Sequence, residues 1–107
     1  MSDAANTQRR RLRIVLDGAV QGFGLCPTVY RAAQRLRLTG WVRRSGADVE
    51  IEVEGGPDRL DRFLGELELQ LSSSIGPVAQ TTMHVMPVNS KWFEILPDFN
   101  RSSQSAS

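Results

Sequence analysis

Cysteine and histidine are nearly missing from this 107-residue chain, which holds one of each. A lone cysteine forms no internal disulfide, and with a single histidine it cannot complete a zinc site. The formal net charge of +1 lacks the basic footprint of nucleic-acid binding. No run approaches the ~18 apolar residues of a membrane span, and residues 1–20 lack a signal-peptide core. We therefore expect a soluble, cytoplasmic protein with no metal, nucleic-acid or membrane partner.

The apolar content is sufficient for one domain. Hydrophobic residues make up 40% of the chain, which supports one core but not two. Residues 1–8 are small and polar and residues 100–107 are rich in serine, so both segments are predicted to be disordered tails. The predicted domain is residues 9–99. Its first residues, Arg9, Arg10 and Arg11, are interpreted as solvated charges.

The spacing of apolar residues predicts alternating strands and helices. In chain order we expect a strand at 11–17, a helix at 27–37, a hairpin over 41–54, a helix at 58–71, and one or two strands within 79–88 and 92–96. The order β-α-β-β-α-β predicts an α+β, ferredoxin-like sandwich: a four-stranded antiparallel sheet, with its first and third strands central and both helices on one face. A Rossmann-type unit is disfavoured, because its parallel crossovers conflict with the hairpin.

A glycine-rich turn joins the first strand to the first helix. Residues 18–24 contain three glycines, and glycine lets an anion approach the main chain closely. Backbone N–H groups at the start of a helix also lack intrahelical partners. Pro27 has no N–H, so an anion cradle must come from the residues before it. The predicted anion-binding residues are Gln21, Gly22, Phe23, Gly24, Leu25 and Cys26.

Several runs of this sequence form a recognisable pattern. They are GAVQGFG (18–24), PTVY (27–30), LTGWVR (38–43), VEIEVEG (49–55) and WFEILP (92–97). Together they resemble the acylphosphatase family over about residues 11–99. PTVY and WFEILP are closest to the N-terminal acylphosphatase-like domain of the hydrogenase-maturation carbamoyltransferase, a much longer protein. The resemblance implies hydrolysis of a mixed carboxylic-phosphoric anhydride, such as an acyl phosphate or carbamoyl phosphate, without cofactor, metal or covalent intermediate.

The resemblance also implies two catalytic positions, and this sequence departs from the family at both. The family arginine that grips the phosphate is replaced by Cys26, and the family asparagine that orients the attacking water is replaced by Arg44. A thiol is a weak donor and a thiolate repels phosphate, while guanidinium has no acceptor with which to align water. We therefore expect weak or absent phosphatase activity.

Three functions stay open from the sequence. The first is a weakly active or inactive domain that binds an acyl-phosphate-type anion or a hydrogenase-maturation partner. The second is an active acylphosphatase in which Arg44 replaces the phosphate-binding arginine. The third is a non-catalytic interaction module that uses an exposed sheet edge.

Cys26 itself has two interpretations. Cysteine near a helix start can be a reactive thiol, and a nearby Arg44 would favour the thiolate. A cysteine-phosphatase loop, however, requires an arginine where Ala32 stands, and Arg31 falls one position short. Inert packing is the favoured interpretation.

Other polar and aromatic residues are assigned structural roles. His84 is interpreted as a structural or surface histidine, because no other ligands cluster with it in the sequence. Trp41 is expected to pack in the core. The acidic row on the second strand of the hairpin is expected to be a solvated face: Glu50, Glu52 and Glu54.

Overall fold

The computed structural model describes residues 9–17, 25–74 and 79–98 of the chain. The predicted tails, 1–8 and 100–107, lie outside the described residues, as do Gln21, Gly22, Phe23 and Gly24 of the predicted anion cradle. The described elements are β1 (Arg10–Asp17), α2 (Leu25–Arg35), β2 (Thr39–Ser45), β3 (Asp48–Gly55), α3 (Pro57–Ser74), β4 (Ala79–Val85) and β5 (Phe93–Ile95).

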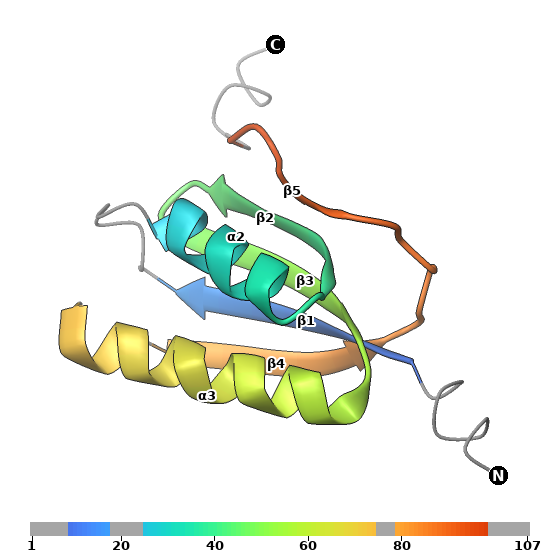
Figure 1. Cartoon of the computed structure of the whole chain (residues 1–107). Coiled ribbons are helices and arrows are strands. Elements are labelled where there is room, and N and C mark those ends of the chain that lie inside the picture. Colours follow the sequence, from blue (N-terminus) through green and yellow to red (C-terminus); the bar gives the residue numbers. More distant parts are fainter. Residues whose placement is uncertain (1–8, 18–24, 75–78, 99–107) are drawn as a thin grey trace, which may run out of the picture.

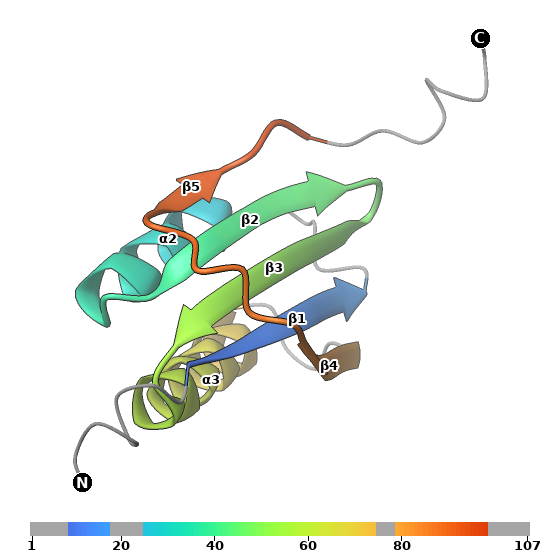
Figure 2. The ribbon, with the colours of Figure 1, turned by 90° about the vertical axis from the view of Figure 1, so that its right-hand side faces the viewer.

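Both helices cover one face of a sheet with the strand order β4-β1-β3-β2-β5 (Figure 1). The predicted ferredoxin-like arrangement is confirmed, with β1 and β3 inside the sheet. The prediction of four antiparallel strands is wrong, because the described residues form five strands and β5 pairs with β2 in parallel. Residues 86–92 join β4 at one edge of the sheet to β5 at the other edge, and they pass over the face opposite the helices (Figure 2).

The face under the helices holds the hydrophobic core. Alternate residues of β1 and β3 point into it, because successive strand side chains point to opposite faces. The helix α3 contributes apolar residues at helical spacing. The central buried residues are Leu12, Ile14, Leu16, Val49, Ile51, Val53, Leu60, Phe63, Leu67 and Leu71.

The helix α2 begins two residues before the predicted start at residue 27. Pro27 lies in its first turn, where a missing N–H removes no intrahelical hydrogen bond. Leu25 is therefore already helical and buried, and Cys26 is the second residue of the helix. The start of α2 thus carries two of the predicted anion-binding residues.

Gly40 allows β2 and β3 to approach closely. Its φ is +133°, and a Cβ added there would lie 1.9 Å from the carbonyl oxygen of Glu52. No side chain fits at that distance, and L-residues avoid that φ. The glycine in the LTGWVR run is thus required by strand pairing.

The open face of the sheet carries ion pairs, which corrects the predicted solvated acidic row. The antiparallel register places Arg11 opposite Glu54 and Arg13 opposite Glu52. Arg11 Nε lies 2.7 Å from Glu52 Oε1, and Arg13 Nη1 lies 2.9 Å from Glu52 Oε2. Arg11 is only 4% exposed, so its interpretation as a solvated charge is also wrong. Glu50, at 8% exposure, accepts a hydrogen bond from Arg43.

Glu54 holds the crossover segment (residues 86–92) against the open face. Its side chain is 0% exposed, and its carboxylate accepts hydrogen bonds from the backbone N–H groups of Val88 and Asn89 at 3.0 and 2.9 Å. Arg9 and Arg11 donate to the same carboxylate at 3.0 and 2.9 Å. Burial raises the pKa of Glu54, but these hydrogen bonds outweigh burial and hold the pKa below its usual value.

Trp41 belongs to the open face and not to the core, contrary to the prediction. Its ring centroid lies 5.8 Å from the Arg13 guanidinium carbon and 5.1 Å from that of Arg43. Indole is the ring that attracts cations most strongly, so Trp41 makes favourable cation–π contacts with two arginine side chains of the open face.

Candidate functional site

Cys26 lies at the start of α2, on the border between core and solvent. Its side chain is half-buried and packs against the hydrophobic core beneath the helix. Its neighbour Leu25 is buried in that core. The location agrees with inert packing, and part of the residue stays exposed.

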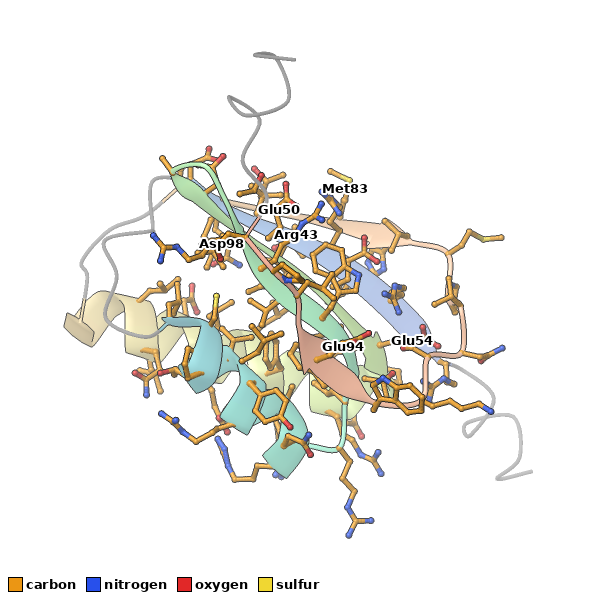
Figure 3. All side chains as sticks on the ribbon, turned by 90° about the horizontal axis from the view of Figure 1, so that it is seen from above. Arg43, Glu50, Glu54, Met83, Glu94 and Asp98 are labelled. Atoms are coloured by element: carbon orange, nitrogen blue, oxygen red, sulfur yellow. The ribbon has the colours of Figure 1, made fainter. Side chains whose placement is uncertain are left out.

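Arg44 lies near the end of β2, on the side of the sheet that faces the helices. It pairs in register with Val49 and follows buried Val42 by two positions, so both side chains point to the same face. Arg43 points to the opposite face, where it pairs with Glu50 (Figure 3). Arg44 is exposed, and it makes no ion pair with any part of the chain that the structure describes.

Two charged side chains have opposite effects on the pKa of the Cys26 thiol. Burial raises the pKa of the thiol, the nearby carboxylate of Asp98 raises it further, and the guanidinium of Arg44 lowers it. The net shift is upward, so the protonated thiol prevails at neutral pH. This result disfavours a reactive thiolate, and it shows that Arg44 and Asp98 both lie within electrostatic reach of Cys26.

Asp98 is the site residue that the sequence analysis missed. It follows β5 and lies toward the end of the sheet where Arg43 and Glu50 are found (Figure 3). The parallel pairing of β5 with β2 carries the chain in this direction, and the backbone N–H of Leu96 donates to the carbonyl of Val42 at 2.9 Å. The sequence contains no signal for this proximity, since it depends on an unpredicted parallel pairing.

The predicted site is therefore described in part. Leu25, Cys26 and Arg44 have defined positions, whereas Gln21, Gly22, Phe23 and Gly24 lie outside the described residues. The roles of all six anion-binding residues and of the two substituted positions remain predictions. His84 is exposed on β4, in agreement with a surface role.

The described residues contain no group of three or more His, Cys, Asp or Glu side chains able to hold a metal ion. Within the same residues, neither helix combines the length and apolar character needed to cross a membrane.

Comparison with known proteins assigns the family. The acylphosphatase family model matches residues 12–95. The chain belongs to the acylphosphatase family. It is 43% identical over 75 residues to the carbamoyltransferase HypF2 of Cupriavidus necator, an alignment that covers 70% of this chain and 9% of that protein. The resemblance to carbamoyltransferases noted from the sequence is thereby confirmed.

Solved structures agree with this assignment. A full-length HypF, in a phosphate- and nucleotide-bound form, superposes with a TM-score of 0.79 at 28% identity, over 87% of this chain and 12% of that one. The acylphosphatase of Bacillus subtilis superposes with a TM-score of 0.68 at 26% identity, over 81% of this chain and 98% of that one. The chain thus spans about a tenth of the carbamoyltransferases and nearly all of the free-standing acylphosphatase.

Proposed function

We propose that this domain binds the phosphate of an acyl-phosphate-type anion at the start of α2 and hydrolyses it weakly or not at all. The observation that carries the proposal is the pair of substituted positions, Cys26 and Arg44, which lie within electrostatic reach of each other on an acylphosphatase scaffold. Full activity would require water to attack phosphorus and the acyl oxygen–phosphorus bond to break, releasing carboxylate and inorganic phosphate. The two substitutions remove the groups that would assist this step.

Cys26 cannot replace an arginine as a phosphate ligand. A guanidinium makes two parallel charge-assisted hydrogen bonds to phosphate, whereas a neutral thiol offers one weak donor. The loss of such a contact costs about 10²- to 10³-fold in rate. Asp98 adds a negative charge near the same position, which disfavours a dianion further.

Arg44 supports retained anion binding and also a second candidate function. Its exposed guanidinium is the positive charge that acts on Cys26, and among the described residues no carboxylate neutralises it in an ion pair. If Arg44 reaches the phosphate, it restores the missing charge from β2 and the domain is an active acylphosphatase. Arg44 still has no acceptor for the attacking water, so weak hydrolysis is the outcome we favour.

The relatives suggest a biological setting for the anion. The similarity to carbamoyltransferases favours carbamoyl phosphate among the acyl phosphates, and a role beside hydrogenase-maturation proteins in the cytoplasm. In that setting the domain would act on a substrate shared with the other parts of a longer protein or with separate partners.

The test of this proposal is a titration with inorganic phosphate in which backbone amide NMR signals are recorded at each phosphate concentration. We expect saturable shifts at residues 21–26 in the wild type and at least tenfold weaker binding in Arg44→Ser, because one cation is lost from the site. Arg10→Ser is the matched control, since Arg10 is an exposed arginine on a different strand, and its affinity should equal that of the wild type.

The outcomes separate the candidate functions. Phosphate binding without turnover supports the proposal, whereas turnover lost together with binding in Arg44→Ala supports the active enzyme. Absence of any saturable shift contradicts both and leaves the interaction module.

A further inference from the structure

The opposite end of α2 forms a second basic site, remote from Cys26. A pocket of about 390 Å³ opens between the end of α2 and the start of α3. At 1.5 Å per residue the two ends of this helix are about 15 Å apart. The pocket is lined by Arg35, Leu36, Arg37, Asp58, Arg59 and Arg62.

Positive charge in this pocket is in excess. Four of the six lining residues are arginines, although the whole chain carries a net charge of only +1. Arg35 is neutralised by Glu66, to which its Nη1 donates at 3.2 Å. Ion pairs within the described residues include none that involves Arg37, Arg59 or Arg62. Asp58 is the single carboxylate in the lining, so with Arg35 paired the lining keeps a net charge of +2, from three arginines and one aspartate.

The backbone conformation of Arg37 is costly for an arginine. Its φ is +57°, and it follows a helix end in which Leu38 N–H donates to Ala33 at 2.8 Å and Arg37 N–H to Gln34 at 3.1 Å. This is the Schellman ending, in which glycine normally takes the left-handed residue. A residue with a Cβ pays about 1 kcal/mol there. Helix termination alone would favour glycine, so the side chain of Arg37 requires another explanation.

Arg59 and Arg62 are also placed against local helix energetics. They are three residues apart on α3, where neighbouring like charges repel. Arg59 lies in the first turn of the helix, where the helix dipole disfavours a cation. The two positive charges therefore destabilise α3 slightly in the free protein. A bound anion would offset this destabilisation.

We propose that this pocket binds an anion with two linked phosphate groups, the chemical class of pyrophosphate and nucleoside diphosphates. The volume lies within the usual range of small-molecule sites. The arginines without an ion pair lie on both sides of the pocket, Arg37 after α2 and Arg59 and Arg62 on α3, so an anion with two linked phosphates can accept paired hydrogen bonds on each side. Leu36 adds a half-buried apolar surface at the edge of the pocket for the remainder of such a molecule.

The first test is calorimetric titration of Arg44→Ser, in which phosphate binding at the start of α2 is weakened, with pyrophosphate and with inorganic phosphate, without divalent metal and at matched ionic strength. We expect pyrophosphate to bind at least tenfold more tightly than phosphate at this pocket. Arg59→Ser and Arg62→Ser should each weaken pyrophosphate binding about fivefold or more, and the exposed control Arg10→Ser should not. Equal affinities for the two anions, or no saturable pyrophosphate binding, would overturn the proposal.

Arg37→Gly gives a sharper test, because it separates binding from folding. The variant should melt at a higher temperature than the wild type, since glycine relieves the left-handed conformation, yet bind pyrophosphate at least fivefold more weakly. A variant that gains stability with unchanged affinity contradicts a binding role for Arg37.

Arg44→Ser distinguishes this pocket from the candidate site at the start of α2. It should reduce phosphate binding there and leave pyrophosphate binding at the arginine pocket unchanged. If Arg44→Ser abolishes pyrophosphate binding while Arg59→Ser has no effect, the anion occupies the first site and the second site is rejected. Failure of the proposed function would leave the pyrophosphate result intact.

Discussion

The two faces of the sheet are stabilised by different chemistry. Under the helices, apolar residues such as Ile14, Ile51 and Phe63 are completely or almost completely buried. On the open face, buried Glu54 and Arg11 are held by hydrogen bonds. The candidate site lies at the margin of the helix-covered face, so it depends little on the open-face network. Stability and anion chemistry should therefore respond to different substitutions.

The largest effect should come from Glu54→Gln. An amide has no negative charge to pair with Arg11, and its NH2 group cannot accept the hydrogen bonds that the backbone N–H groups of the crossover segment donate to the carboxylate. Breaking a buried ion pair in this way costs about 3–5 kcal/mol of unfolding free energy. Chemical denaturation measures the loss. The control is Glu66→Gln, which removes a partly exposed pair with Arg35 and should cost under about 1 kcal/mol. Equal losses of unfolding free energy in the two variants would show that the buried ion pair of the open face stabilises the fold no more than an exposed ion pair does.

Gly40→Ala should be the next most damaging change. The new Cβ would lie 1.9 Å from the Glu52 carbonyl oxygen at a φ unfavourable to alanine, so we expect a loss of about 3 kcal/mol or more. Gly65→Ala is the matched substitution at an exposed position of α3, where nothing lies within 4 Å of the new Cβ, and it should add about 0.5–1 kcal/mol of stability. Melting temperatures of the two variants should move in opposite directions.

The open face should also make stability depend on pH. The folded-state pKa of Glu54 is lowered, so its stabilising contribution is complete above the unfolded value of about 4.3 and is lost as the pH falls through the folded pKa. The gap in unfolding free energy between wild type and Glu54→Gln should narrow as the pH decreases from ~5 to ~2. If the difference in unfolding free energy stayed constant over that pH range, the lowered pKa of Glu54 would be contradicted.

The smallest effects concern Cys26, on the other face. Because its pKa is raised, the thiol should react with iodoacetamide at pH 7 more slowly than free cysteine. Asp98→Asn should shift the alkylation midpoint to lower pH, and Arg44→Ser should shift it to higher pH, because each removes one of two opposing charges. Shifts in the same direction would exclude the described arrangement of these three residues.

The helix-covered face could be predicted from the sequence, and the open face could not. Periodic apolar residues predict which side of β1, β3 and α3 is buried, because hydrophobic burial follows the spacing within one element. The partners of Glu54 come from β1, from Arg9 just before it and from the crossover segment. Only the strand register and the path of residues 86–92 bring these partners together.

The candidate site likewise contains residues that the sequence identifies and one residue that it does not identify. The glycine-rich turn and the family pattern identify Cys26 and Arg44 from local runs of sequence. Asp98 depends on the parallel pairing of β5 with β2, a long-range contact between short segments. Local patterns contain no information on such a contact.

The most direct test of the central claim is the initial rate of acyl phosphate hydrolysis by the wild type and by the double variant Cys26→Arg/Arg44→Asn. Denaturation curves should first confirm that the two proteins have similar stability, as expected for changes at the margin of the core. We predict that the wild type stays near the uncatalysed rate and that the double variant is at least about 10²-fold faster. Rapid, phosphate-inhibited turnover by the wild type would contradict the claim and identify Arg44 as a working phosphate-binding arginine.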